Sequence, residues 1–569
     1  MNNTKKNAVF RLLMVLGGFI ALNIIGYSLR ARLDLTQEKR FSISQTSKNI
    51  LSKLKETVYI KVYLEGDFPS DFKKLHNAAE DILAEMRSQS NGNLQYEFIN
   101  PSESTDTKAT DEVFKQLMKK GLQPSDLQIK QESGLKRQII FPGAMIYYGE
   151  KEIPVNFLQG TSNGGNTQMV INASEENLEY ALMKGIKSCM GEKPKIGVME
   201  GVKTLNRRQI FDAATTLSET YTMQPYNLSS IAAIPNDFKA IIVAKPDTAF
   251  TEWQKFKIDN YLMQGGSVLW CIDPVIADMD SMKAAGFFMS VPAELNLDDL
   301  FFKYGIRINA NLVQDLRCGQ IPVVYGMMGG KPQQDLFPWA YFPIVAAPQG
   351  GATNPISKNI DPVYLQFSSS IDTVGRSKVK KTVLLASSQY TKLLLPPTRI
   401  NLMLATQKPE PSQYNAQPQA IAVLLEGSFE SLYKNRGMNI FANQAIDSLQ
   451  MKRVDVSVPT KQIFIADGDV IKNFVSKTNQ ENYYPLGYDR FTKQLYGNKA
   501  FISNCIDYLA DSENLIEIRN KEITLRLLNK ESIKAQKTLW QLLNIVLPIV
   551  LTIAFGLGYN WWRRRKYAR

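Results

Sequence analysis

Hydrophobic residues follow two different patterns along this chain. Two uninterrupted apolar runs lie near the ends, over residues 12–29 and 539–559. Each is long enough to cross a bilayer as one helix, which takes about 20 residues. Between them, short apolar strands alternate with amphipathic helices. The pattern predicts two transmembrane helices that flank a folded α/β region.

The first part of that region, residues 57–160, has the order strand, helix, strand, helix, strand, strand. Its last two strands are predicted to form a hairpin over 137–158, joined at Glu150 and Lys151. The order is typical of a thioredoxin-like fold, and Pro142 lies where such folds often hold a cis-proline. No cysteine precedes Cys189. The sequence therefore predicts a thioredoxin-like domain that lacks a CxxC motif.

The second part, residues 172–515, repeats buried strands and helices. Apolar strands over 193–200, 238–246 and 267–275 are each separated by a helix. This alternation predicts a parallel sheet with helices on both faces, as in Rossmann-like folds. Stretches rich in proline and glycine, over 326–351 and 409–418, are predicted to be loop insertions.

Positive charge gathers at the two ends of the chain. The net charge is +13, of which residues 1–34 carry +4 and residues 560–569 carry +5. Lipid headgroups favour cations beside apolar spans, so this distribution indicates a membrane and argues against nucleic acid. The cluster Arg563–Lys566 places the C-terminus in the cytoplasm.

Two spans then place both termini in the cytoplasm and the region between them outside it. We expect a cytoplasmic N-tail (1–11), an uncleaved signal anchor (12–29) and a juxtamembrane segment (30–56). After the folded region we expect a membrane-proximal segment (516–538), the second span (539–559) and a basic tail (560–569). A cleaved signal peptide is the alternative for the first span.

Residues that could carry out catalysis are scarce. The chain has one histidine, His76, and four scattered cysteines. It has no phosphate-binding GxxxxGK[ST] motif and no GxGxxG motif. We therefore predict no catalytic residue, no cofactor and no metal site, and we do not expect an enzyme.

Three carboxylates form the best candidate for a remnant of a pocket. Asp273, Asp467 and Asp469 follow apolar strands in the sequences CIDP and ADGD. Ligands of open parallel sheets bind beyond the carboxyl ends of the strands. The alternative is that these residues only stabilise tight turns, since aspartate is common before proline and glycine in loops.

Several long phrases of this sequence resemble one known family. They include LDLTQEKRFSIS, AIAVLLEGSF, QIFIADGDVIKN and GNKAFISNCIDYLAD. The chain is similar along nearly its whole length to the GldG family, the gliding-associated ABC transporter accessory components of Bacteroidetes. The resemblance implies a location in the bacterial inner membrane, with a large periplasmic region. It also implies a central auxiliary domain that is similar to glutamine amidotransferases but lacks their nucleophile.

The resemblance further implies a GldF-like ABC permease and a cytoplasmic GldA-like ATPase as partners, and it leaves a homodimer within the complex open. We therefore expect a non-catalytic auxiliary subunit of an ABC transporter complex involved in gliding motility. A membrane-tethered solute-binding protein and a structural scaffold of the gliding or envelope machinery are the alternatives. Five residues are predicted to contact the permease, or alternatively to pack on lipid or on their own domain: Phe41, Ile43, Trp540, Leu543 and Val546.

Overall fold

The computed structural model describes most of the chain in ranges separated by gaps. The described residues are 10, 12–20, 23, 42–66, 68–103, 106–131, 134–158, 167–279, 282, 286–328, 331–350, 354–375, 379–436, 454–476, 483–511, 513–521, 533–534 and 536–567. Two compact units divide the chain, Met1–Lys521 and Glu522–Arg569. The described β-strands all belong to the first unit, and the second contains one long helix.

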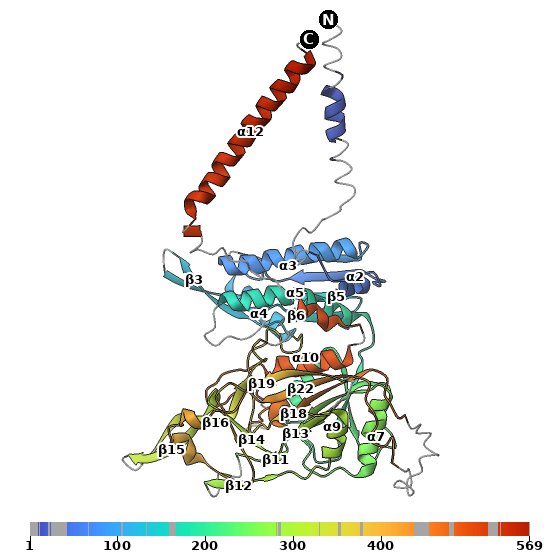
Figure 1. The fold of residues 1–569 in the computed structure, drawn as a ribbon, viewed down its shortest axis with the longest axis vertical. Coiled ribbons are helices and arrows are strands. Elements are labelled where there is room, and N and C mark those ends of the chain that lie inside the picture. The colour runs from blue at the N-terminus through green and yellow to red at the C-terminus, as the bar shows by residue number, and fades with distance from the viewer. Residues whose placement is uncertain are drawn as a thin grey trace. The chain divides into compact units, whose positions relative to one another are not determined.

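The first unit begins with a four-stranded sheet in the order β2-β1-β5-β6. β1 and β2 run parallel, and β5 pairs antiparallel with both β1 and β6. Its side chains alternate between two cores: Ala144 and Ile146 of β5 face α3 and α5, while Met145 faces α4. Helices α3 and α5 pack against each other (Figure 1). The bounds are α2 (Gln45–Leu51), β1 (Val58–Val62), α3 (Ser70–Gln89), β2 (Leu94–Phe98), α4 (Thr107–Lys119), β5 (Gly143–Tyr148), β6 (Lys151–Asn156) and α5 (Thr167–Met190).

The predicted hairpin over 137–158 is only partly correct. Its first strand is interrupted at Pro142, because proline has no backbone N–H for the ladder. Residues before Pro142 form β4 (Gly134–Ile140), which pairs with an unpredicted strand, β3 (Ser125–Gln131). The expected cis-proline is also wrong, since the cis peptide bond among the described residues joins Pro396 and Pro397.

A seven-stranded sheet in the order β19-β22-β23-β10-β9-β7-β8 forms the centre of the unit. The five strands from β23 to β8 run parallel, and β22 and β19 are antiparallel to their neighbours. One face packs on α6 and α10, and the other packs on α7 and α9. The predicted parallel sheet with helices on both faces is therefore present. The bounds are β7 (Lys195–Glu200), α6 (Phe211–Ser218), β8 (Thr222–Asn227), β9 (Phe238–Ala244), α7 (Glu252–Met263), β10 (Ser267–Cys271), α9 (Asp298–Tyr304), β19 (Lys380–Ala386), β22 (Ala420–Gly427), β23 (Thr460–Ile465) and α10 (Asn498–Ala510).

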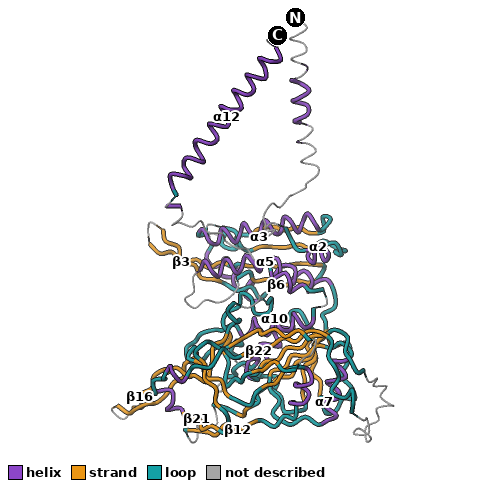
Figure 2. Tube along the Cα trace, viewed as in Figure 1, coloured by secondary structure: helices purple, strands orange, loops and turns teal. Residues whose placement is uncertain are grey.

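A third group of strands inserts between β10 and β22, and most of it surrounds a core of its own, built around Trp339, Tyr341 and Phe342. Strands β13 and β18 instead pack in the core of the seven-stranded sheet. The bounds are β11 (Val275–Ile276), β12 (Phe287–Pro292), β13 (Ile306–Ile308), β14 (Leu312–Asp315), β15 (Cys318–Met328), β16 (Lys331–Val345), β17 (Val363–Tyr364), β18 (Ile371–Thr373), β20 (Thr391–Leu394) and β21 (Thr398–Asn401). Two short 3-10 helices follow, η1 (Leu402–Thr406) and η2 (Pro411–Gln413). Figure 2 shows β16 as part of an extended hairpin with β15.

The prediction of a loop over 326–351 is wrong, because β16 occupies 15 of these residues. The prolines of this stretch favoured a loop in the prediction, since proline is rare inside sheets. Aromatic residues alternate with small or proline residues here, as in Phe337, Trp339 and Tyr341. That period of two matches a strand, and burial of Trp339 and Tyr341 stabilises it.

One continuous apolar core joins the four-stranded and seven-stranded sheets. It contains residues of α3, α5 and α10 together with Ile516 and Ile518 of η5 (Leu515–Asn520). Helix α5 lies within this core, and its Gly185 allows a close approach to the sheet. A Cβ there would lie 2.6 Å from the Val155 side chain and 2.7 Å from Ile146. The two sheets are therefore packed together through α5.

The second unit contains α12 (Lys537–Tyr567), a helix of 31 residues whose apolar window has a mean hydropathy of 2.1. It includes the predicted span 539–559 and is long and apolar enough to cross a membrane. Trp561 lies 4.3 Å from the Arg565 guanidinium, in the aromatic and basic border of the helix. Among the described residues this is the one such helix.

The first predicted span lies largely outside the described residues. Residues 12–20 of it are helical and exposed. Residues 522–532 of the predicted membrane-proximal segment also lie outside the described ranges.

Candidate functional site

The three carboxylates singled out in the sequence meet at one edge of the seven-stranded sheet. Asp273 follows β10, and Asp467 and Asp469 follow β23, the neighbouring parallel strand. Lys245, which directly follows β9, completes the group. Its Nζ lies 2.8 Å from an Asp273 oxygen and 2.6 Å from an Asp469 oxygen. Together with Lys472, whose Nζ lies 3.0 Å from Asp469, we call these residues the strand-end cluster.

Backbone geometry holds the strand-end cluster closely together. Asp467 accepts hydrogen bonds from the backbone N–H groups of Gln366 and Asp469, at 2.6 and 2.7 Å. The N–H of Gly468 donates to Asp273. A Cβ at Gly468 would lie 2.6 Å from the Lys245 side chain, so a glycine is needed there. Lys245 itself has a left-handed backbone with φ of 50°, which disfavours most residues other than glycine.

Burial and mutual charge set the ionisation of the cluster. Burial raises the pKa of Asp467 well above its usual value, and the charges of Asp273 and Asp469 raise it further. Burial also opposes ionisation of Asp469, but Lys245 and Lys472 outweigh it and lower the pKa of that carboxyl. The two lysines thus lie against Asp273 and Asp469, whereas backbone N–H groups surround Asp467.

This arrangement leaves the strand-end cluster without reactive groups. The pKa of Lys245 is raised, because the two carboxylates together outweigh the effect of its burial. A protonated amine is neither a base nor a nucleophile. The ammonium also lies where a cation bound by these carboxylates would lie. The remnant of a ligand pocket stays a prediction, but in this structure a side chain of the protein itself fills that position.

The histidine and the cysteines add no reactive group among the described residues. His76 Nε2 lies 2.9 Å from an oxygen of Glu65 on the surface. The four cysteines are free thiols. Burial raises the pKa of Cys189 to about 11 and of Cys318 to about 12. Described His, Cys, Asp and Glu residues nowhere form a group of three that could hold a metal ion.

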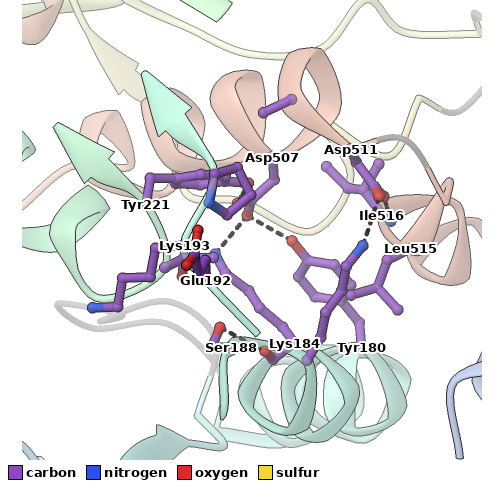
Figure 3. A pocket seen from close by; sticks show the side chains of 14 residues that line it. Tyr180, Lys184, Ser188, Glu192, Lys193, Tyr221, Asp507, Asp511, Leu515 and Ile516 are labelled. Carbon is purple, nitrogen blue, oxygen red and sulfur yellow. Dashed lines mark hydrogen bonds and ion pairs between the residues drawn. The ribbon is translucent and has the colours of Figure 1, made fainter. Parts of the chain in front are cut away.

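A second buried charge lies where α5 meets α10 (Figure 3). Asp507 of α10 accepts hydrogen bonds from Tyr180, Tyr221 and Lys184, at 2.6, 2.9 and 2.6 Å. Burial, and then the Asp507 charge, raise the pKa of both tyrosines well above the usual value. One turn further on, Lys187 pairs with Asp511 at 3.1 Å. The adjoining hollow has a volume of about 60 Å³, which suits water rather than a ligand.

A third network brings together Ser42 and Lys521, which flank the folded region of the first unit. The Lys521 Nζ donates to the carbonyl oxygen of Ser42 at 2.7 Å and lies 3.4 Å from Glu179. Glu179, only 3% exposed, also accepts from the Ser44 N–H at 2.6 Å and the Ser47 hydroxyl at 2.7 Å. We call these five residues the Glu179 junction. The described chain thus enters the folded region and leaves it at adjacent positions.

Arg519 reinforces this junction from the side of η5. Its guanidinium is buried and donates to Asn177 of α5 at 2.9 Å. It also donates to the carbonyl oxygens of Pro355 and Lys358, at 3.0 and 2.8 Å. Helix α5 therefore holds three segments of the chain that are distant in sequence.

The residues predicted to contact a permease have different surroundings. Phe41 lies outside the described residues. Ile43 is 6% exposed and packs into the core of its own domain, which is the alternative to a permease contact. Trp540, Leu543 and Val546 are exposed on α12, and their role stays a prediction.

Sequence reasoning missed Lys245, Glu179 and Asp507. Lys245 had a usable signal, since it follows a buried strand parallel to the one before Asp273. Glu179 and Asp507 lie in helices among other charged residues, and their partners are far away in the sequence. No local pattern distinguishes them.

Comparisons with known proteins agree with an auxiliary role in transport. Residues 193–505 match the family described as "ABC-type uncharacterized transport system", and residues 37–147 match a domain of unknown function, DUF7088. An uncharacterized protein of Borreliella burgdorferi is 22% identical over 550 residues, which cover 94% of each chain.

Two solved structures give weak similarity. An IFT52 N-terminal domain is 12% identical with a TM-score of 0.30, covering 56% of this chain and 98% of that one. An exo-β-1,4-mannosidase from an Opitutaceae bacterium has a TM-score of 0.19, 8% identity, and coverage of 76% of this chain and 51% of that one. The family match, by contrast, covers more than half of the chain. The chain belongs to the family of auxiliary components of ABC-type transport systems.

Proposed function

We propose that this protein is a non-catalytic, membrane-anchored auxiliary subunit that holds a folded domain on the extracytoplasmic side of an ABC transporter. ATP hydrolysis takes place in a separate, GldA-like ATPase, and a GldF-like permease spans the membrane beside it. The observation that carries this proposal is the family match over residues 193–505. The apolar helix α12, with its aromatic and basic border, supports the anchor.

The finer parts of the proposal rest on sequence pattern and topology. Both apolar runs, 12–29 and 539–559, cross the inner membrane of a bacterium, and both termini are cytoplasmic. Residues 57–160 form a thioredoxin-like domain, and residues 172–515 form a Rossmann-like auxiliary domain. The phrases shared with the GldG family favour a role in gliding motility.

The Glu179 junction gives the proposed subunit a way to respond to its transporter. Because Ser42 and Lys521 are held together, movement of the preceding and the following segment reaches α5 at one point. Helix α5 in turn contacts Asp507 of α10 through Tyr180 and Lys184. A displacement at the junction would therefore be transmitted to the seven-stranded sheet.

A tethered solute-binding protein is a weaker candidate. Its ligand would be expected at the carboxyl ends of the parallel strands. Lys245 fills that position and neutralises the carboxylates. A scaffold role without transport differs from our proposal only in its partners.

Co-purification tests the proposal directly. The full chain, tagged in its native host and extracted with a mild detergent, should retain a permease and an ATPase in fixed ratio. Purification without either partner in several detergents would contradict it. A variant with glutamine in place of Arg563, Arg564 and Arg565 serves as a comparison. Because cytoplasmic cations set the orientation of a membrane helix, this variant should insert less reliably, while its first unit stays unchanged.

Cysteine labelling in whole cells tests the topology. A Gln264→Cys variant in a Cys318→Ser background places an exposed thiol near Gly265, while Cys189, Cys271 and Cys505 are buried. A membrane-impermeant maleimide should label Gln264→Cys once the outer membrane is permeable. An Ala568→Cys variant should be labelled only after lysis. Labelling of Gln264→Cys only after lysis would overturn the proposed orientation.

A further inference from the structure

Helix α12 carries a polar residue, Asn544, within its apolar stretch. Asn544 lies five residues inside the span 539–559. At 1.5 Å per residue it is about 8 Å from the end of the span, and the hydrocarbon core of a bilayer is about 30 Å thick. In a helix that crosses the membrane, this side chain therefore lies within the hydrocarbon.

Pro548 leaves a backbone group unpaired at the same position. Proline has no N–H, so a proline inside a helix removes the hydrogen bond to the carbonyl oxygen four residues earlier. Pro548 lies within α12, and the carbonyl that loses its donor is that of Asn544. Thr552 does not replace this donor, because its hydroxyl donates to the Pro548 carbonyl at 2.7 Å. Asn544 thus presents a backbone acceptor that the helix itself does not use.

The Asn544 side chain adds two donors and a second acceptor. An asparagine amide carries two N–H groups and a carbonyl oxygen. Within the described part of the chain no hydrogen bond reaches this amide, and α12 has no buried residue. Unpaired polar groups are costly in hydrocarbon, because no water is there to pair with them. The site therefore needs a partner that offers both a donor and an acceptor at the depth of Asn544.

The helix face that contains Asn544 is suited to contact with a second helix. Its positions alternate at spacings of four and three residues, as do the contact positions of two helices that wind around each other. Near its C-terminal end the side chains are small, which lets two helix backbones approach closely. Leu543 and Val546 lie outside this face and stay available for the predicted permease contact. We call it the Asn544 face, and it consists of Trp540, Asn544, Leu547, Leu551, Ala554 and Gly558.

A second copy of this chain has the groups that the site needs. Its α12 crosses the membrane in the same direction, so in a symmetric parallel pair each Asn544 face lies opposite its counterpart. Each Asn544 then meets, at its own depth, an amide with both donors and an acceptor. No charged residue lies between Lys537 and Arg563, so the two helices carry no like charges that would repel each other within the membrane.

We propose that the Asn544 face joins two copies of this chain within the membrane. The proposal rests on the part of the proposed function that places α12 across the membrane. Each Asn544 amide donates to a carbonyl oxygen of Asn544 in the other copy, either that of the side chain or the backbone oxygen that Pro548 leaves free. Ala554 and Gly558 let the two helices come into contact.

Disulfide crosslinking of the full-length chain in native membranes tests this inference. Leu551→Cys lies on the Asn544 face, and Ile553→Cys lies two residues further on, about 200° around the helix. The two natural side chains are matched in exposure, at 60% and 57%. Both variants are made in a Cys318→Ser background and oxidised with copper phenanthroline. We expect a strong dimer band from Leu551→Cys and little dimer from Ile553→Cys.

Substitutions in α12 test the hydrogen bonds, with the association constant measured by crosslinking at several lipid-to-protein ratios in vesicles. Asn544→Leu should lower this constant about threefold to thirtyfold, because it removes a hydrogen bond between membrane helices. Asn544→Gln keeps the amide and should keep most of the association. Asn560→Leu makes the same change on the other side of α12 and should have no effect. Pro548→Ala gives the Asn544 carbonyl a donor within its own helix, so its effect should be smaller than that of Asn544→Leu.

Asn544→Leu makes the span more apolar, so a loss of crosslinking in this variant does not reflect failed insertion. Equal crosslinking of Leu551→Cys and Ile553→Cys would overturn the inference, as would an unchanged association constant in Asn544→Leu. Crosslinking of Leu551→Cys only to a different protein would overturn it as well. If a permease and an ATPase copurify in such a case, the proposed function stands without the pairing. Face-specific crosslinking that persists where neither partner copurifies would support the pairing and contradict the transporter role.

Discussion

The strand-end cluster and the Glu179 junction are both buried networks of charge, but they join different parts of the chain. In the cluster, Lys245, Asp273 and Asp469 each follow a strand of one sheet. In the junction, Ser42 and Lys521 lie 479 residues apart, on either side of the folded region. Burial and ion pairing are similar at the two places. The segments that they connect indicate that the cluster stabilises one sheet, whereas the junction couples the folded unit to its flanking segments.

The two networks also differ in how completely their buried charges are paired. In the cluster, two lysines pair with two carboxylates at 2.6–3.0 Å, and burial raises the pKa of Asp467. In the junction, Glu179 is held mainly by hydrogen bonds from Ser44 and Ser47, and Lys521 is more distant at 3.4 Å. We therefore expect the cluster to resist opening and the junction to open locally.

Removing the central charge of the cluster should have the largest effect. Lys245→Met leaves Asp273 and Asp469 buried without their shared partner, which typically costs 3–5 kcal/mol. Urea denaturation of the purified protein measures the change. Lys239→Met, on the same strand but exposed, should change stability by less than about 0.5 kcal/mol. Equal effects of the two variants would show that the cluster is not a stabilising network.

The pH dependence of stability tests the ion pairs of the strand-end cluster in a second way. The pKa of Asp469 is lowered in the folded protein, so its contribution is fully present above the unfolded value of about 3.9 and disappears as the pH falls through the folded value. Asp469→Asn should therefore cost about 1.5–3 kcal/mol at pH 7. The difference from the natural protein should shrink below about pH 4. Unfolding midpoints at pH 7, 5 and 3 measure it, and a pH-independent difference would contradict the proposed ion pairs.

The cluster was partly predictable from sequence because the signal at each carboxylate is local, although Lys245 and Asp469 are 224 residues apart. Asp273 and Asp469 follow apolar strands, and parallel strands end at the same edge of a sheet. Strand pattern and turn residues are both visible along the chain. Lys245 was not predicted, although it too follows a buried strand, because a lysine before a proline resembles an ordinary loop residue.

The Glu179 junction and strand β16 were not predictable for different reasons. Glu179 and Ser44 are 135 residues apart, so only the packing of α5 brings them together. Strand β16 was not predicted because its prolines favoured a loop. Alternation of Phe337, Trp339 and Tyr341 was the stronger signal, since burial of large aromatic side chains outweighs the loss of ladder hydrogen bonds at a few prolines.

The smallest global effect is expected at the junction. Glu179→Gln keeps an acceptor oxygen for Ser44 or Ser47 but loses the charge, and it should lower global stability by about 1 kcal/mol. The local loss of stability should be larger, because the Glu179 carboxylate accepts the hydrogen bonds that hold residues 42–47 against α5. Hydrogen exchange followed by mass spectrometry should show faster exchange in Gln45–Leu51 and little change in β9 and β10.

A matched exposed variant separates coupling from general loosening. Glu80→Gln, on the surface of α3, should leave exchange in Gln45–Leu51 unchanged. If Glu179→Gln accelerates exchange throughout the unit, the junction is simply another part of the core, and the contrast with the strand-end cluster fails. If exchange rises only at Gln45–Leu51 and around Lys521, the two ends open together while the sheet stays closed. That result would show that the junction holds both flanking segments to α5 independently of the rest of the core, and that it is the point at which their movement reaches the folded domain.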